Sequence, residues 1–163
     1  MPGASSWSFR EEDHKAIMGH MSALLRETNV KSLMLVDRNG QVVANVGEPP
    51  QFDPQAFASL TAADFSANDQ LAKMIGEHEF SSLFHQGEKE SMYLADVARR
   101  VILVALFDSR TTLGLVRLKM KATVEELTRV FEEMFTRSGT QAPKVEGFGS
   151  KEAEDEIDKL FGD

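Results

Sequence analysis

A run of seven consecutive apolar residues, Val101–Phe107, constrains the fold of this chain more than any other feature. It is too short to cross a bilayer, which takes roughly 20 residues. Arg99 and Arg100 precede it and Asp108 follows it, so it is also shorter than a typical buried helix of ~10 residues or more, and its β-branched residues favour a strand. A strand that is apolar on both faces needs cover on both sides. We therefore expect it in the middle of a sheet with helices above and below.

Length and composition limit what surrounds this strand. A chain of 163 residues, 42% of them hydrophobic, supports one substantial core, so we expect one domain plus a tail. The absence of cysteine excludes disulfides, thiol nucleophiles and cysteine zinc sites. Residues 1–9 contain no apolar segment behind a basic start, so neither a secretory signal nor a membrane anchor is predicted, and a cytoplasmic location is the default expectation.

The charge distribution argues against two classes of partner. The net charge is −8, and half of the excess lies in residues 138–163. Binding to nucleic acid or to an anionic membrane depends on clustered Lys and Arg, so neither is expected as the main partner. The densest basic run, Arg117, Lys119 and Lys121, is interpreted as a solvated helix face.

The first quarter of the chain predicts a helix and a β-hairpin. From Glu11 to Thr28 the apolar residues recur at three- and four-residue steps, and acidic residues stand at the start, where they complement the helix dipole. The segments Ser32–Val36 and Gln41–Val46 then pair as strands around a tight turn, in which Asn39 and Gly40 accept positive φ.

A second helix is predicted after the loop at residues 47–50. Asp53 accepts the free amides of its first turn, Pro54 occupies a position whose own N–H is not needed, and the helix runs to Ile75 before Gly76 ends it. Its expected buried face consists of Phe57, Leu60, Leu71 and Met74. Small or weakly polar residues form much of the rest, and they would let a second backbone approach closely: Ala58, Ala62, Ala63, Ser66, Ala67 and Gln70.

The second half of the domain predicts three antiparallel strands and a long helix. The strands are Glu79–His85, Ser91–Val97 and Val101–Phe107, joined by short connections. Apolar residues then recur at three- and four-residue steps from Leu113 to about Phe135, which favours one helix over a short alternating strand.

The two ends of the chain are expected outside the domain, which spans residues 11–136. Residues 1–10 are predicted to be disordered, and residues 137–150 to form a flexible linker because they are rich in Gly, Ser and Thr. Residues 151–163 are acidic, with Ile157, Leu160 and Phe161 on one helical face. Such a segment is too short to be a stable helix alone, so it either folds when it binds a groove or is a solubilising tail.

No pattern in the sequence indicates catalysis. No Gly is followed by Lys, which excludes the usual phosphate-binding loop, and no Gly-x-Ser-x-Gly motif occurs. His78 and His85 lack the spacing of a helical zinc site. The carboxylate pairs Glu125-Glu126 and Glu132-Glu133 fall on the solvated side of the last helix, so we expect surface charges there and not acid–base catalysts. We expect neither a cofactor nor a metal, and a regulator rather than an enzyme.

The order of these elements resembles the roadblock family. Five segments resemble in particular its MglB branch, bacterial proteins of cell polarity and gliding motility: Val36–Gln41, Ala58–Ala62, Leu71–Glu77, Phe84–Gly87 and Phe107–Gly114. The similarity covers about residues 10–136, and the acidic ending also looks like the tail of some MglB proteins.

This resemblance implies a three-layer α/β/α sandwich with a five-stranded antiparallel sheet of order 2-1-5-4-3. It also implies a homodimer in which the third strands of two copies pair and their second helices lie adjacent, because an exposed strand edge is a liability unless it is covered. The dimer residues would be Glu79, Phe80, Ser81, Ser82, Leu83, Phe84 and His85.

The resemblance further implies a small Ras-like GTPase, of the MglA type, as the partner. The family's GTPase carries its own arginine, so its regulator holds the switch loops in the competent arrangement and thereby accelerates hydrolysis. The expected contacts are Ala62, Ala63, Ser66, Ala67, Asp69, Gln70 and Lys73. Residues Ile157, Leu160 and Phe161 would dock other polarity proteins, and the cell poles are an expected location.

Three alternatives stay open at this stage. In the first, the small residues of the second helix pack the dimer and do not contact a GTPase. In another, Asp64, Asp69 and Gln70 make the surface more polar than in relatives, so the chain would be a scaffold that binds without activating. In the third, Arg110 would reach the GTPase as a finger in trans.

Overall fold

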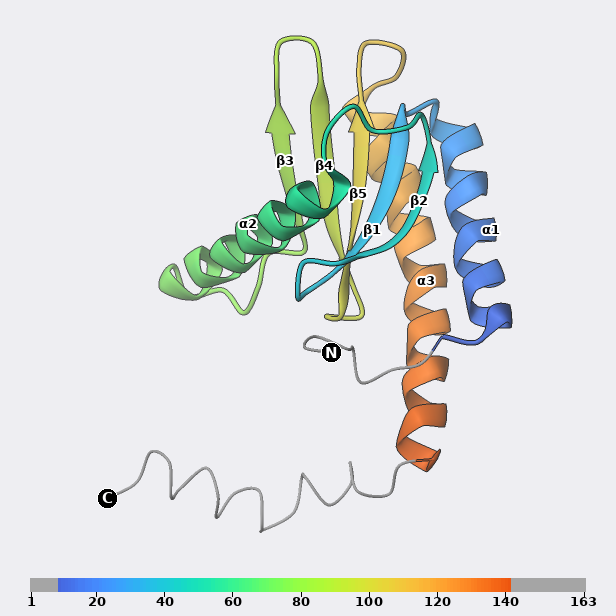
Figure 1. Ribbon diagram of the computed structural model, residues 1–163. Coiled ribbons are helices and arrows are strands. Elements are labelled where there is room, and N and C mark those ends of the chain that lie inside the picture. Colours follow the sequence, from blue (N-terminus) through green and yellow to red (C-terminus); the bar gives the residue numbers. More distant parts are fainter. Residues whose placement is uncertain (1–8, 142–163) are drawn as a thin grey trace.

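The computed structural model describes residues 9–141 as a three-layer sandwich (Figure 1). Helix α2 crosses one face of a five-stranded antiparallel sheet, and α1 and α3 lie side by side on the other face. The helices are α1 (Glu11–Thr28), α2 (Pro54–Met74) and α3 (Leu113–Gln141). The strands are β1 (Ser32–Asp37), β2 (Val42–Gly47), β3 (Ser82–Gln86), β4 (Ser91–Val97) and β5 (Val101–Phe107).

The apolar strand β5 lies at the centre of the sheet, as its composition predicted. The strand order is β2-β1-β5-β4-β3, and β5 pairs along its whole length with β4 on one side and with β1 on the other. Six of its seven residues are buried. The expected fold class is confirmed, because a strand without polar residues is stable only where helices cover both of its faces.

Alternate residues of β5 belong to two separate cores. Leu103 and Ala105 pack with Leu24, Leu127 and Phe131 in the core beneath α1 and α3. The neighbouring β5 residues point the other way, into a smaller core beneath α2, since successive side chains of a strand alternate between faces. That smaller core consists of Met34, Val36, Ala58, Phe65, Leu94, Ile102 and Val104.

The predicted hairpin forms, but its turn differs in detail. The carboxylate of Asp37 accepts hydrogen bonds from the N–H groups of Asn39 and Gln41, both at 2.9 Å. Because Asp37 holds the turn in this way, only Gly40 needs a positive φ (87°), and Asn39 does not adopt one. The second strand consequently starts at Val42 instead of Gln41, and a bulge follows because Val36 pairs with Val42 while Leu35 pairs with Ala44.

Two other boundaries differ from the prediction by three residues or more. Strand β3 starts at Ser82 and not at Glu79, because only Ser82–Gln86 pairs in register with β4. Helix α3 continues to Gln141, so the first residues of the predicted linker 137–150 are helical. Residues 1–8 and 142–163 lie outside the described part of the chain, and with them most of the expected disordered N-terminus and the tail residues Ile157, Leu160 and Phe161. Within residues 9–141, no helix combines the length and apolarity that crossing a membrane requires.

Candidate functional site

Helix α2 turns most of its large apolar side chains away from the core, which overturns the predicted orientation; of the residues predicted to be buried, only Phe57 packs against the core, and only in part. Leu60, Leu71 and Met74 were expected to be buried but are 72%, 57% and 82% exposed. The buried side is made of residues that the sequence suggested were a second face, such as Ala58 and Ala62, with Phe65 as the one large side chain. Small side chains let the helix lie close to the sheet, so the large residues must face outward.

The exposed apolar residues follow one line along the helix. Leu60, Ala67, Leu71 and Met74 are separated by seven, four and three positions, which places them on a single helical face, and Ile75 (71% exposed) extends it. We call Leu60, Ala67, Leu71, Met74 and Ile75 the apolar stripe. Apolar area of this kind in water usually marks an interaction site.

The apolar stripe faces the free edge of the sheet. The neighbouring α2 residue Asp64 reaches β3, where its Oδ2 atom lies 2.6 Å from Nε2 of His85. Strand β3 pairs with β4 only, so in the described part of the chain its other side has no strand partner. Figure 1 shows α2 running out past this edge. An unpaired strand edge and an apolar helix face are thus continuous, and both are features that proteins normally cover.

A second, polar line of residues runs along α2, one position before the first. Ser59, Ser66, Gln70 and Lys73 repeat the same spacing, and each is at least partly exposed. We call these four residues the polar stripe. Its side of the helix faces the β1–β2 turn, because Gln55 donates from Nε2 to the carbonyl of Gly40 (2.6 Å) and the hydroxyl of Ser59 lies 3.4 Å from that carbonyl.

A partly buried charge cluster ties α2 to the sheet. Arg38, just after β1, donates from Nη1 to Asp69 of α2 (2.8 Å) and from Nη2 to Asp96 of β4. Its guanidinium also lies over the ring of Phe65, 4.9 Å from the centroid. Burial on its own lowers the pKa of Arg38, but the hydrogen bonds to Asp69 and Asp96 outweigh it and raise that pKa. Arg38 therefore stays charged and connects the end of β1 with α2 and β4.

The seven residues predicted to contact a GTPase thus occupy different environments. Ala62 is buried against the sheet, at 8% exposure, and lies on the core side of α2. Asp69 is engaged by Arg38, with its side chain 23% exposed. The other five are not buried: Ala63, Ser66, Ala67, Gln70 and Lys73.

Sequence reasoning missed Leu60, Leu71 and Met74 as surface residues because it assigned the largest side chains to the core. The sequence does contain a signal for the observed orientation. One helical face carries mostly small side chains, which lets the helix lie close to the sheet: Ala58, Thr61, Ala62, Phe65 and Ala72.

The residues predicted to pair two subunits lie around β3. Glu79, Phe80 and Ser81 precede the strand, and Glu79 accepts a hydrogen bond from Arg99 Nε (2.9 Å). Within the strand, Leu83 packs in the core beneath α2, whereas Phe84 packs on the opposite side and stacks on Phe107 with centroids 6.2 Å apart. The strand is therefore anchored by alternate side chains, and its outer backbone is left for pairing.

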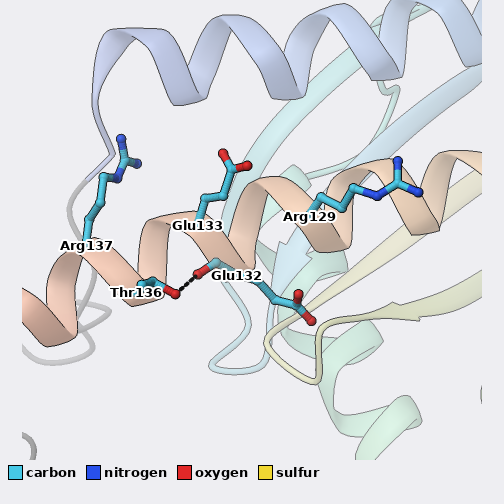
Figure 2. Close-up of a pocket in the computed structure, with 5 residues that line it drawn as sticks. All are labelled: Arg129, Glu132, Glu133, Thr136 and Arg137. Atoms are coloured by element: carbon cyan, nitrogen blue, oxygen red, sulfur yellow. Dashed lines mark hydrogen bonds between the residues drawn. The ribbon is translucent and has the colours of Figure 1, made fainter.

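A hollow of about 520 Å³ along the last turns of α3 shows no catalytic arrangement. Figure 2 shows Glu132 and Glu133 pointing in different directions from the helix. Of the flanking arginines, Arg129 pairs with Glu126 (2.5 Å) and Arg137 with Asp13 (2.6 Å). In the part of the chain that the structure describes, no three His, Asp or Glu side chains are grouped as metal ligands.

Comparison with known proteins gives consistent matches over this fold. A model of the Roadblock/LC7 domain matches residues 20–107. The structure is similar to that of Myxococcus xanthus MglB, with 43% identity, 78% of this chain and 95% of that one covered, and a TM-score of 0.73. The gliding protein MglB of Thermus thermophilus is 31% identical, with 78% and 97% covered and a TM-score of 0.74. An MglB with a tetrameric arrangement is also 31% identical, with 79% and 97% covered and a TM-score of 0.74.

Proposed function

The chain belongs to the Roadblock/LC7 family, and from its similarity to MglB proteins we propose that it is a dimeric regulator of a small Ras-like GTPase of the MglA type, in cell polarity and gliding motility. The observation that carries the proposal is the apolar stripe of α2 beside the free edge of β3. A surface of this composition is suited to contact another protein. The role assigned to the chain in this proposal is therefore that of a regulator.

The first role of this surface is self-association. Two copies related by a two-fold axis pair their β3 strands, which joins two five-stranded sheets and brings the two α2 helices together. The apolar stripes then cover each other, so Leu60, Leu71 and Met74 leave water. The strand contribution comes from Ser82–Gln86, and the segment before it, from Glu79 to Ser81, lies at the margin of the joint.

The second role is binding of the GTPase. The polar stripe of α2 points away from the β3 edge, so dimerisation leaves it accessible on both copies. Ser66, Gln70 and Lys73 offer hydroxyl, amide and ammonium groups to polar switch loops. The regulator accelerates hydrolysis only to the extent that it binds the competent loop arrangement more tightly than the others, while the GTPase supplies its own arginine.

Phosphate release from the cognate MglA-type GTPase, with and without this chain, tests the proposal. We expect faster release with the wild-type chain, and loss of that stimulation when Ser66→Arg and Gln70→Arg fill the polar stripe with large cations. Glu133→Arg, on α3 across the sheet, is the matched control and should stimulate like the wild type. Equal stimulation by the polar-stripe variant would contradict the assigned contacts, and absence of both binding and stimulation would remove the GTPase from the proposal.

A second candidate function is a scaffold that binds the GTPase, or another polarity protein, without activating it. The observation in its favour is that α2 carries two carboxylates whose side chains are already held, Asp64 by His85 and Asp69 by Arg38. Such a fixed surface can bind a partner without rearranging it. Binding of the GTP-loaded protein with an unchanged hydrolysis rate distinguishes the scaffold from the activator, and deletion of residues 151–163 tests whether the tail contributes to any partner contact.

A further inference from the structure

The first three turns of α3 form a surface that the proposed function does not use. It carries Arg117, Lys119 and Lys121, and no acidic residue occurs between Leu113 and Val124. Two large apolar side chains stand among these cations, Leu115 at 37% and Leu118 at 65% exposure. We call Leu115, Arg117, Leu118, Lys119 and Lys121 the basic face. Helix α3 lies across the sheet from α2 (Figure 1).

The cations of the basic face differ from most others on the described surface. Arg38, Arg99, Arg110 and Arg137 each pair with a carboxylate. In contrast, none of Arg117, Lys119 and Lys121 forms an ion pair within residues 9–137, and the guanidinium of Arg117 lies over the ring of Tyr93, 5.9 Å from its centroid. Cations near a helix N-terminus also gain nothing from the helix dipole. A solvated face accounts for the charges but not for the exposed leucines between them.

The matching chemistry is an acidic segment with apolar residues on one side, and the chain carries one. Residues 152–161 contain five acidic residues and one lysine, with Ile157, Leu160 and Phe161 at helical spacing. We propose that this C-terminal segment docks on the basic face of its own subunit, with its carboxylates against the cations and its apolar residues over Leu115 and Leu118. The inference is independent of the GTPase proposal.

The chain is long enough for this contact. Leu118 lies about 35 Å back along α3 from Gln141, at 1.5 Å per residue. The roughly 15 residues between Gln141 and Ile157 span up to about 50 Å when extended. The segment therefore reaches the basic face without any rearrangement of the domain, and tethering raises its effective concentration there.

The experiment uses the full chain with a spin label on the tail. Because the sequence has no cysteine, Gly162→Cys provides a unique attachment site next to Phe161. We expect the oxidised label to broaden the amide signals of residues 113–124 and to leave those of α2 sharp, since the sheet separates the two. The broadening should disappear in about 0.5 M salt, where exposed charges are largely screened.

Charge reversal tests the pairing directly. Arg117→Glu, Lys119→Glu and Lys121→Glu together should abolish the broadening, and Glu154→Lys, Glu156→Lys and Asp158→Lys in the tail should restore it in the combined variant. Lys73→Glu, a cation on α2, is the control and should leave the broadening unchanged.

Three results would overturn the proposal. Broadening of the amide signals of α2, or of no amide signal in the domain, would show that the tail does not dock on the basic face. Broadening that appears only in mixed samples, with the label on one copy and the isotope on another, would assign the tail to a second copy. Binding of the chain to phosphatidylglycerol vesicles through the basic face, without tail contact, would assign that face to a membrane surface.

Discussion

The two faces of the sheet are built by opposite rules. Beneath α1 and α3, large side chains interlock, and Ile17, Leu24, Leu127 and Phe131 are almost completely buried. Beneath α2, Phe65 is the only large helix side chain that is fully buried; Phe57 packs against that core only in part, and Leu60, Leu71 and Met74 turn outward. We therefore expect the first face to supply most of the stability of the subunit. The second leaves its apolar area for association with another chain.

A large apolar side chain can either pack in the core of its own subunit or remain exposed for contact with another chain, and the two faces of the sheet differ in this respect. On the α2 side, polar ties replace much of the missing apolar contact, since Arg38 joins Asp69 and Asp96, and Gln55 joins Gly40. Such ties fix the position of a helix without using its large side chains.

The largest effect is expected at the apolar stripe. The double variant Leu71→Ser, Met74→Ser should weaken self-association on the order of 10⁴-fold. It removes four apolar side chains per dimer, and the burial of each contributes about 1.5 kcal/mol or more to the free energy of association. Stability of the isolated subunit should change by less than ~0.5 kcal/mol, since both side chains are mostly exposed there. Sedimentation equilibrium measures the association. Leu118→Ser on α3 is the matched control and should leave self-association unchanged. Equal weakening by Leu118→Ser would contradict the assignment of the dimer interface to α2.

The next largest effect is expected in the core of the opposite face. Phe131→Ala should lower the free energy of unfolding by about 3–5 kcal/mol, because it leaves a cavity beneath α1 and α3. Urea denaturation measures this most clearly in the Leu71→Ser, Met74→Ser background, where association does not contribute. Phe52→Ala, which removes a 41% exposed ring, is the control. A loss below about 1 kcal/mol in Phe131→Ala would mean that this core does not dominate stability.

Removal of the charge cluster should act mainly on α2. Arg38→Met leaves Asp69 and Asp96 partly buried without their cation, and we expect a loss of about 2 kcal/mol in the free energy of unfolding. Hydrogen exchange should accelerate in α2 and remain unchanged in α3. Arg38→Lys keeps the charge and should recover part of the loss. Uniform acceleration throughout the chain would show that α2 does not depend on this tie in particular.

The smallest effect is expected for the ion pair between Asp13 of α1 and Arg137 of α3, on the side of the sheet opposite to α2. Burial raises the pKa of Asp13, but hydrogen bonds from Arg137 and from the N–H of Arg10 outweigh it and hold that pKa below its usual 3.8. The stabilisation is therefore complete above the usual pKa and is lost as the pH falls through the lowered one. Asp13→Asn should cost about 1 kcal/mol at pH 7, and this cost should shrink as the pH falls through the lowered pKa of Asp13.

Chemical denaturation from pH 7 to pH 2 measures the difference between the wild type and Asp13→Asn. Glu11→Gln, whose carboxylate is exposed and only 4.0 Å from Lys15, is the control and should change stability little at any pH. A constant difference between wild type and Asp13→Asn over this range would contradict the assignment to the Asp13–Arg137 pair.

Much of the fold could be predicted because its signals are local. The bounds of Glu11–Thr28, Ser91–Val97 and Val101–Phe107 were predicted correctly from periodicity, charge and turn residues. Asp53 caps α2 as expected, through a hydrogen bond from the N–H of Gln55. Of the residues predicted to contact a GTPase, Ser66, Gln70 and Lys73 are accessible on α2 while Ala62 is buried, and their role in binding stays a prediction.

The sequence by itself determined the type and order of the elements, because hydrogen-bonding periodicity and capping act within a few residues. The tertiary structure alone decided which side of α2 faces the sheet. Periodicity shows which residues share a helical face, but the choice of face depends on how closely the helix approaches β1, β4 and β5 and on ties such as Arg38–Asp69, 31 positions apart in the chain. That choice, made by packing, leaves Leu60, Leu71 and Met74 on the surface.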